Sequence, residues 1–186
     1  IPSEKALKKG DIVNIDVTVI LDGYYGDTSR MFMVGNKIPV AGKFLVEACY
    51  ECMWRGIDAI KPGVSLNEVG IACEKFAKEQ GLSVVHEYGG HGIGKEFHED
   101  PFVCHYDTRD NNVMLKPGMI FTVEPMLNSG SRHISDLNDG WTVVTRDRSL
   151  SAQWEHTVLV TETGYEVLTL SEGYPELPDF IKAKLK

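Results

Sequence analysis

The stretch NIDVTVILDGYYGDTSRMF, residues 14–32, restricts the fold most strongly, because it places two carboxylates inside runs that are otherwise typical of buried strands. Apolar and mixed positions alternate over residues 12–20, and this period of two predicts a strand with one apolar and one polar face. An Asp-Gly pair follows, which is typical of a hairpin turn, and the apolar run after Asp27 predicts the returning strand. The sequence therefore predicts a hairpin that carries Asp16 and Asp27, and something must compensate their charge.

Two amphipathic helices are expected after the hairpin. Apolar residues recur at intervals of three and four over residues 43–60, which predicts a helix that the following Pro-Gly pair ends. Ser65 and Glu68 have the spacing of a capping box and Gly81 is typical of a helix end, so a second helix is predicted between them. After residue 81 the chain consists of short apolar runs and glycine-rich turns, which predicts mostly strands.

Composition favours one domain. The 186 residues are 42% hydrophobic and show no break in composition, so we expect a single domain over residues 1–186 with a surface tail over residues 172–186. The formal net charge of −8 disfavours nucleic acid and anionic membranes as ligands. The longest apolar runs have the length of strands, well short of the roughly 20 residues that span a bilayer. A soluble protein that binds neither nucleic acid nor membrane is expected.

The four cysteines are too few for a disulfide scaffold at this length. Cys49 and Cys52 form a CxxC motif, which raises the alternative of a zinc or redox site. There is no second CxxC, and both residues lie in a helical pattern. Buried free thiols in a reducing compartment are the favoured interpretation.

His91 lies among glycines in GGHGIGKEFHEDP, which is the second candidate site. Glycines around a histidine indicate close backbone approach or unusual φ angles. A phosphate-binding loop is one alternative, but the strand, GxGxxG and helix order that it requires is absent. For this motif taken alone, an ordinary turn histidine is the simplest interpretation.

Two further acids occur within or beside apolar strands, Glu124 in MIFTVEPML and Glu155 in SAQWEHTVLVT. A buried carboxylate is costly unless it is paired or coordinated, although each glutamate alone could be a surface residue at a strand end. If the four carboxylates converge, they repel one another unless cations lie between them. Oxygen ligands with one imidazole suit Mn, Fe(II), Co or Zn, and carboxylates can bridge two ions in a hydrolytic site. The spacing leaves open whether they converge.

The chain resembles type I methionine aminopeptidases, which have the metallopeptidase fold called pita bread. The resemblance runs in order through most of the chain, in the segments IDVTVILDGYYGDTS, HEYGGHGIGKEFHEDP, LKPGMIFTVEPM and DGWTVVTRDRSLSAQWEHTVLVT. It implies an α+β pita-bread (creatinase/aminopeptidase) fold, in which a curved antiparallel sheet is flanked by helices. It also implies a metalloaminopeptidase that hydrolytically removes the N-terminal methionine from nascent polypeptides, by means of a water activated by a dinuclear metal site.

The resemblance implies two divalent metal ions, with Co, Mn, Fe(II) and Zn as candidates. In the family pattern Asp16 chelates one ion, and Asp27 and Glu155 bridge both. The other ion takes His91 and Glu124, and Glu124 is also the implied general base.

Three more residues match positions of the family that contact substrate. His98 resembles a histidine that contacts the scissile peptide and steadies the tetrahedral intermediate. Phe97 and Trp141 match aromatic residues that line the methionine pocket, with an ordinary core aromatic as the alternative for each. The implied partners are nascent polypeptides beginning with Met, and association with the ribosome stays open. The resemblance also implies a monomer that is located in the cytoplasm or in an organelle.

The chain departs from the family at its amino end. Family members usually have a further N-terminal segment that ends in a His-Gly-Ile-Pro stretch, whereas this chain begins at Ile1-Pro2. An N-terminally incomplete fold is therefore expected. Two other hypotheses are an Xaa-Pro aminopeptidase or dipeptidase on the same fold, and a catalytically incompetent fragment or binding protein that retains the fold.

Overall fold

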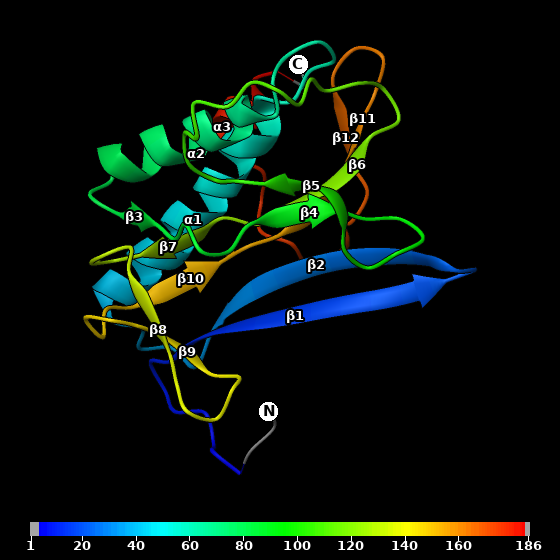
Figure 1. Ribbon diagram of the computed structural model, residues 1–186. Coiled ribbons are helices and arrows are strands. Elements are labelled where there is room, and N and C mark those ends of the chain that lie inside the picture. Colours follow the sequence, from blue (N-terminus) through cyan, green and yellow to red (C-terminus); the bar gives the residue numbers. More distant parts are fainter. Residues whose placement is uncertain (1–3, 185–186) are drawn as a thin grey trace.

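The computed structural model describes residues 4–184 and is an α+β structure, in which helices lie against one side of curved antiparallel strands (Figure 1). The helices are α1 (Val40–Asp58), α2 (Asn67–Glu79) and α3 (Asp179–Lys182). The strands are β1 (Ile12–Leu21), β2 (Tyr24–Met33), β3 (Ser83–Val84), β4 (Gly90–Gly92), β5 (Glu99–Val103), β6 (Ile120–Val123), β7 (Met126–Asn128), β8 (Ile134–Asp136), β9 (Val143–Thr145), β10 (Ser151–Gln153), β11 (His156–Val160) and β12 (Tyr165–Val167).

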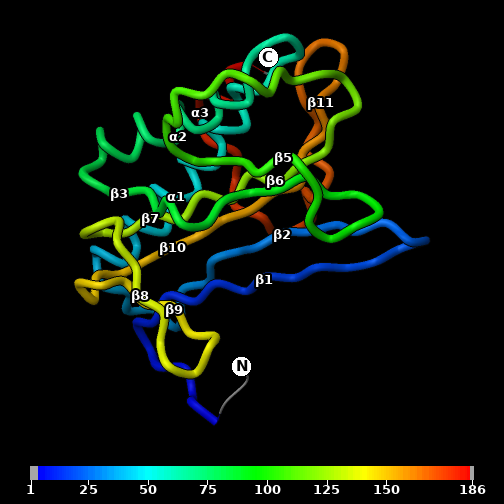
Figure 2. The backbone as a smooth tube through the Cα atoms, viewed as in Figure 1, coloured from blue at the N-terminus to red at the C-terminus, as the bar shows by residue number. Residues whose placement is uncertain are grey.

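The strands form two larger antiparallel sheets and two hairpins. The five-stranded sheet has the order β12-β11-β6-β4-β5, and the three-stranded sheet has the order β10-β7-β3. The chain passes from the first sheet to the second at Glu124 and Pro125, which separate β6 from β7. The β1–β2 hairpin extends past the other strands on one side of the molecule (Figure 2). The mostly β character predicted after residue 81 is confirmed.

The hydrophobic core lies between the two long helices and the strands. α1 buries Leu45, Met53 and Ile57 completely, and α2 does the same with Val69 and Cys73. Each apolar side chain of this size contributes on the order of 1.5–3 kcal/mol to stability when it leaves water. This packing gives the strands a rigid support on one side and leaves their other side available for a site.

The predicted helices are confirmed, with corrections at their ends. α1 begins at Val40 rather than at residue 43, because Pro39 has a φ of −55° and leads directly into the helix. The apolar pattern missed this first turn because Val40 is exposed. The predicted capping box is wrong. The Ser65 hydroxyl accepts a hydrogen bond from the Asn67 N–H at 3.1 Å, and the Glu68 N–H donates to the Ser65 carbonyl instead.

The segment from residue 172 onward also needs correction, because its described part is not simply a surface tail. Ile181 in α3 is 3% exposed and belongs to the core. The Tyr174 hydroxyl lies 2.7 Å from the Thr28 hydroxyl of β2. The proline-rich composition suggested a loose end, but the apolar residues within it fold back onto the helices and strands.

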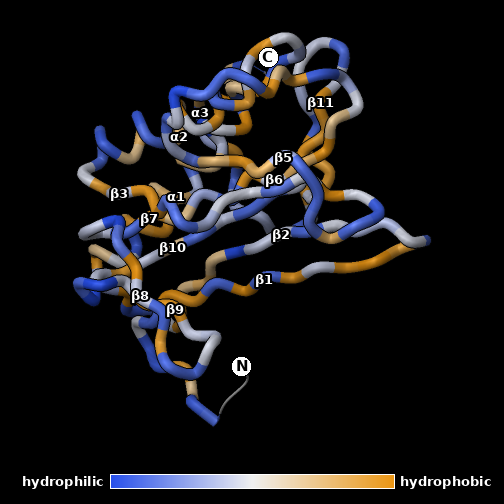
Figure 3. The backbone as a smooth tube through the Cα atoms, in the orientation of Figure 1, coloured by the Kyte–Doolittle hydropathy of each residue, from blue (hydrophilic) through white to orange (hydrophobic). Residues whose placement is uncertain are grey.

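The predicted hairpin is confirmed, and its two faces differ. Asp16 lies opposite Ser29, and Thr18 lies opposite Asp27, so both aspartates share one face. The other face presents an exposed apolar stripe that consists of Ile15, Val17, Val19 and Leu21. Hydrophobic and hydrophilic colours alternate along β1 in Figure 3. The hairpin therefore has one polar face toward the rest of the structure and one apolar face toward solvent.

None of the four cysteines is in a disulfide. The prediction of buried thiols is confirmed for Cys49, Cys52 and Cys73 and is wrong for Cys104, which is half-buried. None of the described helices combines the length and apolar character that crossing a bilayer requires.

Candidate metal centre

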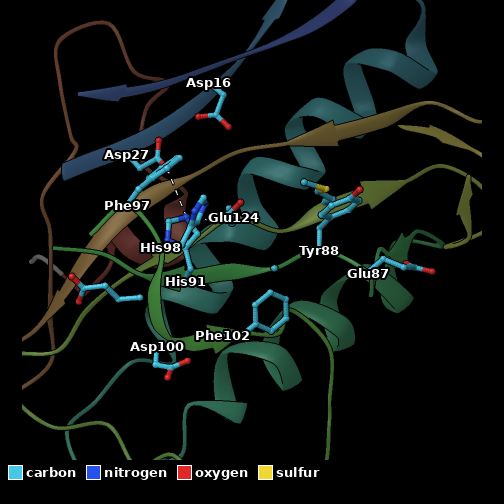
Figure 4. A pocket seen from close by; sticks show the side chains of 13 residues that line it. Asp16, Asp27, Glu87, Tyr88, His91, Phe97, His98, Asp100, Phe102 and Glu124 are labelled. Carbon is cyan, nitrogen blue, oxygen red and sulfur yellow. Dashed lines mark ion pairs between the residues drawn. The ribbon is translucent and has the colours of Figure 1, made fainter. Parts of the chain in front are cut away.

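Three side chains meet where the β1–β2 hairpin packs on the rest of the structure, one from β2, one from β4 and one from the residue before β11. Ligand atoms of Asp27, His91 and Glu155 all lie within 4.8 Å of one another. Asp27 and His91 line a cleft of about 650 Å³ together with Asp16 and Glu124, and Glu155 is buried next to them. Figure 4 shows Asp16 and Asp27 above this cleft and His91 with Glu124 below it. The folded chain thus brings together side chains that are far apart in the sequence.

His91 is held in the orientation that a metal ligand needs. It lies in β4, whose glycines permit close packing, since a Cβ at Gly90 would collide with the carbonyl of Thr122 on β6. The ring Nδ1 is 3.0 Å from the Gly92 carbonyl, so Nδ1 carries the proton and Nε2 is left as an acceptor. Nε2 faces Glu124 Oε1 at 3.6 Å and Asp27 Oδ2 at 3.8 Å. Burial lowers the pKa of His91, which favours the neutral ring that coordinates metals.

Glu124 occupies the corner between β6 and β7, and its carboxylate is fixed at both oxygens. Oε1 accepts a hydrogen bond from the Thr122 hydroxyl at 2.6 Å, and Oε2 accepts one from the Gln153 amide at 3.0 Å. Burial nevertheless raises the pKa of Glu124 well above its usual range, and the charges of Asp27 and Asp16 add to the effect. The site therefore orients this carboxylate but does not neutralise it.

Among these acidic side chains, Glu155 has the fewest contacts that could offset its charge. The residue is 1% exposed, and neither carboxylate oxygen has a hydrogen-bond partner among the described residues. Its backbone is fixed, because its N–H donates to the Ser29 carbonyl and its own carbonyl accepts from the Thr28 hydroxyl. Burial, followed by the charge of Glu124, raises the pKa of Glu155 strongly. A divalent cation fits this donor set, since it would give two orphaned buried oxygens the positive partner that they lack.

The hairpin contributes two aspartates in unequal settings. Asp27 is 3% exposed and accepts a hydrogen bond from the Thr18 hydroxyl at 2.8 Å. Its backbone is tied to β11, where the Thr157 hydroxyl donates to the Asp27 carbonyl at 2.7 Å. Asp16 is exposed as a residue, although partial burial of its carboxyl group and the nearby charge of Asp27 raise its pKa to about 6. Neither Asp16 nor Glu124 belongs to the compact group of Asp27, His91 and Glu155.

The predicted substrate-contacting residues fall into two clefts. Phe97 and His98 line the cleft with the carboxylates, and the His98 ring centroid is 4.3 Å from that of His91. Tyr25 stacks on Phe97 at 5.7 Å, which supports the loop from the hairpin side. Trp141 is 70% exposed and lines a separate cleft of about 830 Å³. The structure therefore does not bring Trp141 together with Phe97.

Sequence reasoning missed the residues that hold the carboxylates. Thr122 accepts a hydrogen bond from the His91 N–H at 2.9 Å while its hydroxyl donates to Glu124. Gln153 reaches Glu124 from β10, and His105 accepts from the Glu124 N–H at 3.0 Å. A polar residue two positions before Glu124 in an apolar strand was the available signal for Thr122, but nothing local indicated His105.

Comparison with known proteins decides the family. Residues 1–162 match metallopeptidase family M24. The chain belongs to this family. A methionine aminopeptidase of Escherichia coli strain K12 is 57% identical over 166 residues, which are 89% of this chain and 62% of that relative. The chain thus spans less than two thirds of the length of that relative.

Solved structures of the family confirm the pita-bread fold and the resemblance to methionine aminopeptidases. The crystal structure of methionine aminopeptidase from Rickettsia prowazekii has a TM-score of 0.87 and 51% identity, and the match covers 91% of this chain and 68% of that one. Prolidase from Pyrococcus furiosus has a TM-score of 0.70 and 29% identity, and the match covers 91% of this chain and 44% of that one. In a metallopeptidase family, the buried group of Asp27, His91 and Glu155 could bind metal.

Proposed function

We propose that this chain carries the catalytic centre of a metalloaminopeptidase that removes the N-terminal methionine from nascent polypeptides. The observation that supports this most directly is the meeting of Asp27, His91 and Glu155 within 4.8 Å, in a member of a metallopeptidase family. The identity of 57% to a methionine aminopeptidase favours that activity over others on the same fold.

The centre would hold two divalent ions, with Co, Mn, Fe(II) and Zn as candidates. The proposed ligands are four carboxylates and one imidazole, namely Asp16, Asp27, His91 and Glu124, which line the cleft, and the buried Glu155 next to them. Asp27 and Glu155 are suited to bridging because each is buried and close to His91. When bound, such ions supply a water of lowered pKa and polarise the scissile carbonyl.

The protein groups around the centre would then bind the substrate, accept a proton and donate a hydrogen bond to the reacting peptide. Glu124 is the proposed general base, because its carboxylate lines the cleft beside His91 and is oriented there by Thr122 and Gln153. His98 lies beside His91 at the open side of the cleft, where a ring N–H can donate to the oxygen of the scissile peptide. Phe97 would contact the methionine side chain, and Trp141 would do so from the neighbouring cleft. Thioether sulfur packs favourably against aromatic rings.

The proposed partners are polypeptide N-termini that begin with Met, offered during or soon after synthesis. Such substrates place the proposed site of action in the cytoplasm, or in an organelle that makes protein, with the ribosome as a candidate neighbour. The chain is proposed to act as a monomer, because all the proposed ligands come from one chain.

Hydrolysis by a sister enzyme specific for Xaa-Pro bonds is the second candidate, since the prolidase of Pyrococcus furiosus shares the fold. The test is to incubate the 186-residue chain, loaded with Mn²⁺ or Co²⁺, with Met-Ala-Ser and with an Xaa-Pro dipeptide. Release of methionine from the first and no hydrolysis of the second is the expected result. Hydrolysis of the Xaa-Pro peptide alone would replace the proposal with the second candidate. Absence of both activities from a chain that binds metal would favour a binding protein.

A further inference from the structure

Glu124 lies at a point where the regular backbone pairing stops. The ladder between β6 and β11 ends with Val123 opposite His156, and β6 pairs with β4 at Phe121. Pro125 follows, and β7 then enters the other sheet. The N–H of Glu124 is therefore outside every strand ladder, although a buried N–H needs an acceptor.

His105 supplies that acceptor. Its Nε2 lies 3.0 Å from the Glu124 nitrogen and accepts the hydrogen bond. The residue follows β5, which pairs with β4, and it is 1% exposed. An acceptor nitrogen carries no proton, so the neutral ring with its proton on Nδ1 is the form that makes this contact.

The side chain of Glu124 is anchored by other groups. Thr122 and Gln153 each donate to one carboxylate oxygen, whereas neither touches the Glu124 backbone N–H. The carboxylate lies 3.6 Å from His91 Nε2. Rotation of the peptide unit at the corner would strain both side-chain hydrogen bonds and so shift the carboxylate relative to His91.

We propose that His105 is a positioning residue for the metal centre, whose ring nitrogen replaces the missing strand partner of Glu124 and fixes its carboxylate against His91. This inference rests on the proposed function, because it assigns a role toward a metal that the five ligands would hold. It differs from a space-filling role in one respect. A phenylalanine fills nearly the same volume but offers no acceptor, whereas a glutamine offers an oxygen at similar reach.

The test compares His105→Phe, His105→Gln and a control, Val69→Ala, which removes buried volume in α2. Co²⁺ affinity is measured by calorimetry and by the visible absorption of the bound ion, and folding by circular dichroism. We expect His105→Phe to bind Co²⁺ about ten- to a hundredfold more weakly, as is typical when a group supporting a ligand is lost. His105→Gln and Val69→Ala should bind as the wild type does.

Two results would overturn the inference and leave the proposed function intact. One is a folded His105→Phe chain with wild-type affinity and absorption. The other is an equal loss in His105→Gln, because that variant retains an acceptor. If the phenylalanine variant does not fold, His105→Asn replaces it. The asparagine side chain is polar but too short to reach the Glu124 N–H. Wild-type Co²⁺ affinity in the asparagine variant would also contradict the inference. A wild-type chain that binds no Co²⁺ would instead overturn the proposed function, and the inference with it.

Discussion

Glu155 directly precedes the central strand β11 and has 1% of its surface exposed, whereas Asp16 lies on β1 of a hairpin that extends from the molecule (Figure 1). The glutamate has neighbours on every side and no partner for its oxygens among the described residues. The aspartate has water within reach on its strand. The two sides of the cleft therefore contain the same chemical group at very different electrostatic cost.

This difference teaches which part of the centre depends on a cation. Transfer of an ionised carboxylate into a protein interior costs several kcal/mol unless a charge or hydrogen bonds compensate it. The side of the cleft with Glu155 and Glu124 bears that cost, and Asp16 bears little of it. We expect a cation to bind first beside His91 and the glutamates, and Asp16 to matter for the second ion.

The largest expected effect is on catalysis. Asp27→Asn removes a charge at the centre of the ligand group and should reduce methionine release from Met-Ala-Ser to background. Cys52→Ser is the control, because it changes a residue of α1 that is also buried. The Cys52 thiol donates to the Cys73 carbonyl, and a serine hydroxyl can donate to the same acceptor, so the rate should change only slightly. A similar loss in both variants would mean that general destabilisation, and not the metal centre, explains the result.

Metal content should separate the two sides of the cleft next. Glu155→Gln should leave no tightly bound Mn²⁺ after dialysis, because it removes a buried ligand that no other group replaces. Asp16→Asn should retain one equivalent, held by His91 and the glutamates. Elemental analysis of both variants and of the wild type measures this. Retention of the full content by Glu155→Gln would reverse the comparison.

The free energy of unfolding of the metal-free chain should differ less between the two variants, and here Glu155→Gln should be the favourable change. Glu155→Gln removes an uncompensated buried carboxylate, so the metal-free variant should be more stable at neutral pH, by about 1 kcal/mol or more. Asp16→Asn should stabilise the metal-free chain less than Glu155→Gln does, because the Asp16 carboxyl group is only partly buried. Urea denaturation in the presence of a chelator measures both. A destabilised Glu155→Gln chain would contradict this account of its burial.

The smallest expected effect is a pH dependence. Burial raises the pKa of Asp16 to about 6, and those of Glu124 and Glu155 are also raised. In the unfolded chain these carboxyl groups ionise at about pH 4. Their protonated forms therefore stabilise the metal-free fold fully below about pH 4, and this stability is lost as the pH rises through about 6 and above.

A bound cation keeps the carboxylates ionised at lower cost. The increase in Tm on addition of Mn²⁺ should therefore be larger near pH 8 than near pH 5.5, since protons compete with the metal at the lower value. Thermal unfolding at both pH values, with Mn²⁺ and with chelator, measures the difference. An equal or larger increase at the lower pH would argue against metal binding by these carboxylates.

The sequence predicts local elements well because their signals are local. Alternation along β1 and the Asp-Gly turn are sufficient for the hairpin, and helical spacing is sufficient for α1 and α2. Ends of elements were less certain, as Val40 and Ser65 illustrate, because caps depend on backbone contacts that a pattern does not contain.

The convergence of the site residues depends on long-range contacts, which the sequence pattern alone could not predict. Spacing left open whether Asp27 and Glu155 converge, and only the hydrogen bonds between β2 and the start of β11 bring them together. The resemblance to a family implied the proposed ligand set. It did not indicate His105, whose role depends on the sheet corner at Glu124.

Calorimetric titration of the metal-free 186-residue chain with Mn²⁺ tests the central claim most directly. The account predicts saturable binding of two equivalents, with the tighter one unaffected by Asp16→Asn and abolished by Glu155→Gln. Absence of saturable binding, or a tighter equivalent that survives Glu155→Gln unchanged, would contradict it.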